Sequence, residues 1–390
     1  VGGVIIAETS KEKLLDSIYG NVTSNLQSNG RGGALSTNFT KTNSNGWYYK
    51  FQGTLKRMGD FETPKYAMTN TGFSEHNFSF KAGLNRIDHG FDIYYSLFSN
   101  RLGILRSSHA HTAIDIINAI ENEIPHIIED FSYNINIPRQ KISHNLLKLK
   151  AFKNFDFGKL VMRYDFQAND RKEFDIRRGD SRGKPALDLN LKTHSLAFDL
   201  ETKFENNSNF KAGISGRYQK NFPDPYTGVK RIIPDYKKYD FSIYSIYDIG
   251  LSDQWLLEGG IRYDFSHINA YKYYRTSLWE ARNYDQLFPE IVVEDLGLNI
   301  LTNPKFNFNN MSSNLGTRYS INKGENIYFN YSISSRKPNP SELFSEGLHH
   351  SSARIEIGDL RFNSEVGHNV SLTYNFVNEN SSLTVNSFAN

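Results

Sequence analysis

Short segments in which apolar and polar residues alternate recur along almost the whole chain. In residues 160–167, Leu160, Met162 and Tyr164 alternate with Arg163 and Asp165. A period of two places apolar side chains on one face of a β-strand and polar side chains on the other. The sequence therefore predicts about fifteen strands, at residues 21–29, 34–41, 47–57, 76–84, 91–99, 145–152, 160–167, 194–204, 210–219, 239–248, 255–265, 311–321, 326–334, 366–376 and 382–389.

Most of these strands have roughly 8 to 11 residues, which is close to what a tilted strand needs to cross the hydrocarbon layer. Their connections alternate between short and long. The short ones, rich in Asn, Asp, Gly and Ser, fall at residues 42–45, 85–89, 153–158, 205–209, 250–253, 322–325 and 377–381. The long ones fall at residues 58–75, 100–144, 168–193, 220–238, 266–310 and 335–365.

This alternation of connection lengths indicates a sheet with two different ends. In an up-and-down sheet every second connection lies at the same end, so all the long connections are expected at one rim. Outer-membrane barrels have short periplasmic turns and long extracellular loops. We therefore predict an all-β fold, a transmembrane antiparallel up-and-down β-barrel with this arrangement of turns and loops.

The composition agrees with a barrel and excludes several function classes. The chain has 28 Phe and 23 Tyr but no Cys, and aromatic rings are common at the lipid boundary of such barrels. The absence of Cys excludes a disulfide framework and a thiol nucleophile. The net charge of +3, without a basic run, gives no sign of nucleic-acid binding. The motifs of phosphate-binding loops, serine hydrolases and zinc proteases are absent, so no enzyme is predicted.

Histidines in the long connections are candidate metal ligands. His109 and His111 stand at the start of a helix-like pattern at residues 112–120, and His349 and His350 lie in the connection 335–365. Imidazole is a common neutral metal ligand and also ligates haem iron. The alternative is that these residues are solvated loop histidines without a ligand. Three further histidines are expected in or beside long connections: His126, His144 and His267.

Charged residues gather at two further places. Arg336 and Glu342 flank a Pro-rich segment in which the prolines end a strand, and both are candidate ligand-binding residues at the root of the loop. A second set near residues 165–178 is predicted to form cross-strand ion pairs in a wet lumen rather than a catalytic pair. Its members are Asp165, Arg171, Glu173, Asp175, Arg177 and Arg178.

Three segments resemble TonB-dependent outer-membrane receptors. The opening VGGVI is similar to the end of that family's plug domain. The segment RKPNPSELF at residues 336–344 resembles the RAP-x-x-x-EL box, and EIGDL at residues 356–360, with Glu365, resembles the GNP-x-L-x-x-E box that follows it. Lys337 stands where the box usually has Ala, and residues 358–360 lack the Asn-Pro. The segments YDFQANDR at 164–171 and IPRQ at 137–140 resemble Bacteroidetes-type members.

The resemblance implies energised uptake of a scarce, bulky nutrient that is captured by the outer loops. The expected partners are the TonB–ExbB–ExbD complex, which acts through an N-terminal plug, and outer-membrane lipid. The expected cargo is a metal chelate, haem or a ferric siderophore, with no intrinsic cofactor. In haem-type members a loop His between the two boxes ligates iron, and His349 and His350 occupy that interval.

Three alternatives to this function remain at the level of sequence. The first is uptake of zinc or another nutrient by the same architecture. The second is a passive porin or adhesin barrel without a plug, and the third is a soluble all-β carbohydrate-binding or hydrolytic protein. Within the receptor interpretation, residues 1–9 are expected to end the plug domain and residues 10–390 to form an incomplete barrel. Because closed barrels of this kind have about 22 strands, further hairpins are expected after Asn390.

Overall fold

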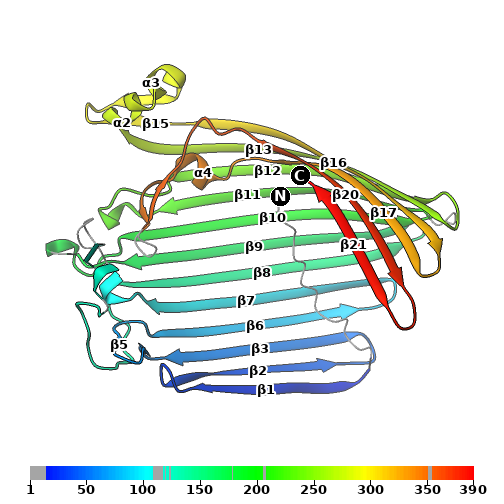
Figure 1. The fold of residues 1–390 in the computed structure, drawn as a ribbon, viewed down its shortest axis with the longest axis horizontal. Helices are drawn as coiled ribbons and strands as arrows, with labels where there is room; N and C mark the ends of the chain where they lie inside the picture. Colours follow the sequence, from blue (N-terminus) through cyan, green and yellow to red (C-terminus); the bar gives the residue numbers. More distant parts are fainter. Residues whose placement is uncertain are drawn as a thin grey trace.

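The computed structural model describes residues 15–108, 117–118, 120–122, 124–177, 179–204, 208–349 and 354–390. Most of this described chain forms one antiparallel sheet of 17 strands. The long strands follow one another in up-and-down order, and the sheet curls so that β20 and β21 pass in front of it (Figure 1). In chain order these long strands are β1 (Ser17–Gln27), β2 (Gly32–Thr42), β3 (Trp47–Met58), β6 (Phe73–Asn85), β7 (His89–Gly103), β8 (Arg139–Phe155), β9 (Gly158–Phe174), β10 (Leu187–Lys203), β11 (Asn209–Pro223), β12 (Asp235–Gly250), β13 (Trp255–Arg275), β16 (Lys305–Asn322), β17 (Glu325–Arg336), β20 (Glu365–Val377) and β21 (Ser382–Ala389).

Each predicted strand overlaps one of these fifteen long strands, so the predicted sheet is confirmed. Most observed strands are longer than predicted, and β13 reaches 21 residues, whereas β21 has the predicted bounds Ser382–Ala389. β13 is the longest because its last residues extend past its pairings with β12 and β16. At this far end it pairs with the short strand β15 (Asn299–Thr302), and on its lumen face Ile268 and Tyr274 are buried in a hydrophobic cluster.

The sheet has one apolar face and one polar face. On β12, the apolar side chains of Tyr239, Phe241 and Ile243 are exposed, whereas Asp240 and Ser242 between them are buried. In a membrane barrel the apolar face meets lipid and the polar face lines the lumen. Alternation along the strands therefore assigns each side chain to lipid or to the lumen.

Charged side chains on the lumen face pair with one another, as predicted. Lys148 Nζ on β8 lies 3.8 Å from Asp165 Oδ1 on β9. Arg171 Nη2 lies 2.5 Å from Glu173 Oε1, and that glutamate is buried. Of the predicted set, Arg178 lies outside the described residues. These contacts confirm ion pairing for part of the set.

The two ends of the sheet carry different connections (Figure 1). At one end the strands are joined by two to five residues, at 43–46, 86–88, 156–157, 204–208, 251–254, 323–324 and 378–381. At the other end lie the long connections 59–72, 104–138, 175–186, 224–234, 276–304 and 337–364. The connection 28–31 is the exception, because it is short but lies at the long-loop end. The predicted separation of loop lengths is otherwise confirmed.

Small elements fill the long-loop end, which we call the mouth. In the predicted helix at 112–120, the described residues 117, 118 and 120 are helical, and the others lie outside the described residues. Two helices in residues 276–287 were not predicted. No helix among the described residues is long and apolar enough to cross a membrane. The small elements are β4 (Phe61–Glu62), β5 (Ala67–Met68), η1 (Arg106–Ser108), η2 (Gly179–Ser181), η3 (Pro225–Thr227), α2 (Thr276–Ala281), α3 (Tyr284–Leu287), η4 (Pro289–Ile291), β14 (Val292–Asp295), β15, α4 (Pro340–Phe344), β18 (Glu346–His349) and β19 (Arg354–Ile357).

Candidate functional site

The segment 336–344 joins the end of β17 to the short helix α4. Asn339 caps the helix, because its Oδ1 accepts hydrogen bonds from Ser341 N and Glu342 N, both at 3.1 Å. Glu342 Oε2 in turn accepts from Asn339 N at 2.8 Å, which completes a capping box. Pro340 occupies the first helical position, where the missing N–H costs nothing. The local sequence therefore fixes a sharp turn into a helix at the mouth.

Arg336 bridges the two boxes identified in the sequence. Its Nη1 donates to Glu342 Oε2 at 2.9 Å, and its Nε donates to Glu365 Oε2 at 3.0 Å. The hydrogen bond from Arg336 lowers the pKa of the Glu342 carboxyl. Two of the candidate ligand-binding residues, Arg336 and Glu342, are thus partners of each other at the root of the loop. All three side chains keep part of their surface exposed.

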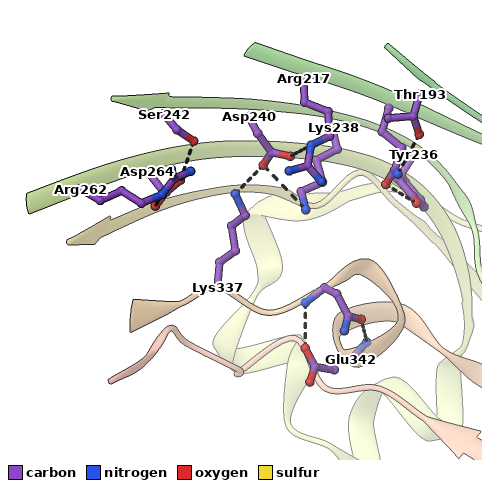
Figure 2. Close-up of polar contacts among 12 residues, drawn as sticks. Thr193, Arg217, Tyr236, Lys238, Asp240, Ser242, Arg262, Asp264, Lys337 and Glu342 are labelled. Carbon is purple, nitrogen blue, oxygen red and sulfur yellow. Dashed lines mark hydrogen bonds and ion pairs between the residues drawn. The ribbon is translucent and has the colours of Figure 1, made fainter. Parts of the chain in front are cut away.

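Lys337, where the family box usually has Ala, ties this loop to the barrel wall. Figure 2 shows its side chain reaching Asp240 on β12, and Lys337 Nζ donates to Asp240 Oδ1 at 2.6 Å. Lys238 Nζ and Arg217 Nε each lie 3.7 Å from a carboxylate oxygen of the same residue. One buried carboxylate therefore faces three cations, and this part of the lumen carries excess positive charge.

A hydrophobic cluster holds the small helices against the inner side of β12, β13 and β16. Phe344 of α4, Trp279 of α2 and Tyr284 of α3 are almost completely buried in it. Ring contacts connect the helices, since the Trp279 and Tyr284 centroids lie 5.3 Å apart. Burial of rings this large is a major stabilising term for a small structure. The cluster comprises Tyr236, Ile268, Ala270, Tyr274, Trp279, Tyr284, Ile300, Phe308, Leu343, Phe344 and Leu360.

A buried ion pair lies beside this cluster. Lys272, on the part of β13 beyond the long-strand sheet, has its Nζ 3.0 Å from Glu346 Oε2 and donates to the Phe344 carbonyl at 2.6 Å. Burial lowers the pKa of Lys272 to about 8, because the attraction of Glu346 offsets desolvation only in part. Burial alone acts to raise the pKa of Glu346, but the charges of Lys272 and Lys230 outweigh it, so that pKa is lowered.

The second box is fixed to α3. Tyr284 Oη donates to Asp359 Oδ1 at 2.9 Å and accepts from Leu360 N at 3.1 Å. Hydrogen bonds from Arg361 lower the pKa of the Asp359 carboxyl to about 2. The residues that depart from the family box therefore form contacts of their own, which dock the connection 337–364 onto the unpredicted helices.

The structure places the histidines unevenly. His349 is the last residue of β18, whereas His109, His111 and His350 lie outside the described residues. Two expected loop histidines are strand residues instead: His144 belongs to β8 and His267 to β13, because those strands extend further than predicted. Among the described residues there is no group of three or more His, Cys, Asp or Glu that could hold a metal ion.

Sequence reasoning missed Asp240, Lys272, Tyr284 and Glu346 as parts of the mouth. Each has a partner that lies 72 to 116 residues away along the chain. Only Asp240 could have been found from the local sequence, because it is a charged residue at a lumen-facing position of a predicted alternating strand. The others sit in segments taken for irregular loops.

The sequence profile of the family described as TonB dependent receptor-like, beta-barrel matches residues 10–390. The chain belongs to this family. The fold, the apolar outer face and the two-ended arrangement of connections are those of a TonB-dependent receptor barrel, and the protein lies in the outer membrane. The resemblance stated from the sequence is confirmed at the level of the family.

Solved structures agree with this barrel fold. The alcaligin outer-membrane receptor FauA from Bordetella pertussis superposes with a TM-score of 0.61 at 10% identity, covering 97% of this chain and 52% of the receptor. A double mutant of the Serratia marcescens hemophore receptor HasR, in complex with its hemophore HasA and heme, superposes with a TM-score of 0.62 at 13% identity. The match covers 95% of this chain and 53% of HasR. The copper transporter OprC superposes with a TM-score of 0.62 at 10% identity, covering 95% of this chain and 52% of the transporter. No curated protein sequence matches the chain.

These three proteins are only distantly related in sequence to the chain, so the likeness concerns the fold. The chain spans about half the length of each of the three structures. The family is one of receptors and transporters rather than enzymes.

Proposed function

We propose that this barrel belongs to a receptor that imports a scarce metal chelate, haem or a ferric siderophore, across the outer membrane by TonB-dependent active transport. The observation that carries the proposal is the folded mouth. The connection 337–364 is held by buried contacts through Phe344, Glu346 and Leu360 rather than hanging free. Preorganised loops bind a rare ligand at a lower entropic cost, whereas a passive pore has no need of them.

The solved relatives favour a metal chelate as the cargo. One of them is described as a receptor for alcaligin and another as a hemophore receptor in complex with heme. The partner is the TonB–ExbB–ExbD complex, which acts on a plug domain. On this proposal residues 1–9 are the end of the plug, and residues 10–390 belong to the barrel.

The residues proposed to meet the cargo lie at the mouth. Arg336 and Glu342 present partly exposed charge at the root of the loop. His349 ends β18, and the chain places His350 next to it. Together with His109 and His111, which lie outside the described residues, these histidines are the proposed iron or haem ligands.

Ligand titration of the full receptor tests this proposal. Haemin, ferric alcaligin and Zn²⁺ are titrated against the wild type and against the variant H109A/H111A/H349A/H350A. If the receptor takes haem, the wild type binds haemin and the quadruple variant binds it at least about tenfold more weakly. This is a loss of about 1.4 kcal/mol in binding free energy. The control H89A removes a histidine at the short-turn end of the sheet, and it leaves the affinity unchanged.

The outcomes separate the alternatives. Haemin or ferric-alcaligin binding supports a chelate receptor, and binding of Zn²⁺ alone supports zinc uptake. Unchanged affinity in the quadruple variant removes the histidine assignment. Uptake that persists after the TonB partner is deleted or the proton gradient is collapsed contradicts active transport and supports a passive porin.

A further inference from the structure

A row that crosses five strands on the outward, apolar face of the sheet has a lysine on four of them. Lys192 on β10 lies opposite Lys220 on β11, which lies opposite Lys237 on β12. The row continues through Asn269 on β13 to Lys305 on β16. We call Lys192, Lys220, Lys237 and Lys305 the lysine row. Its members share the face of Tyr239 and Phe241, because they are an even number of residues away along the paired strands.

No member of the lysine row forms an ion pair with the described residues, and only a longer-range interaction joins Lys220 to Asp235. All four side chains are exposed, and none lies within 4 Å of a carboxylate of the described residues. Two carboxylates in the row above already have partners: Asn190 Nδ2 donates to Asp170 Oδ1 at 2.6 Å, and Arg231 pairs with Asp235. Like charges directly opposite on adjacent strands destabilise a sheet. An external anion would remove that repulsion.

One row closer to the short-turn end, aromatic rings cross the same strands. Phe166, His194, Tyr218, Tyr239 and His267 form this aromatic belt. Successive centroid distances along it are 4.7, 6.4, 5.0 and 6.3 Å. Amphipathic rings of this kind mark the boundary between hydrocarbon and headgroups in membrane barrels.

The dimensions place the lysine row at the level of the lipid headgroups. On β13 the apolar face runs from Trp255 at the short-turn end to His267 in the aromatic belt. Twelve residues at about 3.3 Å each give roughly 40 Å along the strand, or about 30 Å across the membrane at a tilt of about 40°. This distance equals the thickness of the hydrocarbon core, and the lysines lie one row beyond it on the long-loop side.

The face below the belt suits acyl chains. A shallow groove lies over the small residues Ala212 and Ser245 and is flanked by Phe198, Ile214 and Ile243. Its lining is almost entirely apolar, and it crosses the strands from β9 to β16 on the short-turn side of the lysine row. The positive charge of the lysine row and the apolar groove on its short-turn side match an amphiphile that has an anionic head group.

We propose that the lysine row binds the phosphate groups of phosphorylated lipids in the outer leaflet, whose acyl chains lie along the apolar face below. Adjacent strands lie about 4.8 Å apart, so one phosphate can contact the ammonium groups of two lysines on neighbouring strands. The lipid acts as a counter-ion that the protein itself does not supply. This inference rests on the outer-membrane barrel and not on the proposed cargo.

Lipid binding to the full receptor chain in detergent tests the inference. The probes are bisphosphorylated lipid A and, as a neutral lipid, phosphatidylcholine, and bound lipid per protein is measured by native mass spectrometry. The wild type prefers lipid A, and K192Q/K220Q/K237Q/K305Q binds it at least about tenfold more weakly, in line with the attraction of each lysine to an anionic surface. High salt abolishes the preference, because exposed charges are screened.

Two further variants make the outcome decisive. K192R/K220R/K237R/K305R keeps the charge and retains the preference for lipid A. K153Q/K159Q/K203Q/K323Q removes the same charge at the short-turn end of the sheet and leaves binding unchanged. The inference is overturned if both Gln variants lose lipid A binding equally. It is also overturned if K192Q/K220Q/K237Q/K305Q binds lipid A like the wild type while its heat-modifiable gel mobility shows a folded barrel.

Discussion

At the scale of single residues, the mouth depends on charges that meet across long stretches of sequence. Lys337 reaches Asp240, which is 97 residues away, and Lys272 reaches Glu346. The family resemblance marked Lys337 only as a departure, because nothing in the local pattern names its partner. Buried charges of this kind contribute little net stability when paired, but they are costly when one partner is removed.

Removing the Glu346 carboxylate tests this view of the buried pair. Glu346→Ala leaves Lys272 buried without a counter-ion and removes the contact with Lys230. We expect the docking of residues 337–364 to lose about 3 kcal/mol, the usual consequence of breaking a buried pair. Hydrogen exchange in α4 and β18 measures the loss as faster local opening.

The exposed Glu290 offers a matched control for this substitution. It lies in η4 at the same end of the sheet, and no ion pair within 4 Å joins it to the described residues. Glu290→Ala leaves hydrogen exchange at the wild-type rate. Equal protection of α4 and β18 in both variants contradicts a structural role for the buried pair.

At the scale of elements, the sequence predicted the long strands and missed the small helices. Alternation identified all fifteen strands, because lipid on one side and the lumen on the other impose a period of two. α2 and α3 have only 6 and 4 residues, too few for a helical period to show. Their stability comes from the burial of Trp279 and Tyr284 against distant strands, which no local pattern encodes.

Phe344 tests whether the mouth is an independently stabilised element. Its ring is fully buried in the hydrophobic cluster and stacks at 6.3 Å on Phe306. Phe344→Ala is expected to cost about 3–5 kcal/mol locally, so α2, α3 and α4 exchange amide hydrogens faster while β6 to β9 keep their protection. The control Phe362→Ala removes a half-exposed ring from the same connection and has little effect. Loss of protection throughout the sheet contradicts a separate mouth.

At the scale of the whole molecule, the two faces and the two ends of the sheet give the protein its orientation. The apolar face fixes it in the outer membrane, and the polar face encloses a charged lumen. The short turns mark the periplasmic end and the folded mouth the outer end, where both the proposed cargo and the proposed lipid contacts lie. The proposed cargo site and the proposed lipid site both depend on this orientation.

The most direct test of this orientation is cysteine labelling on intact cells. Because the chain has no Cys, Tyr226→Cys and Ile87→Cys each introduce a single thiol, and the native side chains at the two positions are 86% and 89% exposed. Tyr226 lies in a long connection and Ile87 in a short turn. A membrane-impermeant maleimide is expected to label position 226 on intact cells and position 87 only after the outer membrane is permeabilised. Labelling of both positions on intact cells, or of position 87 alone, would contradict the account.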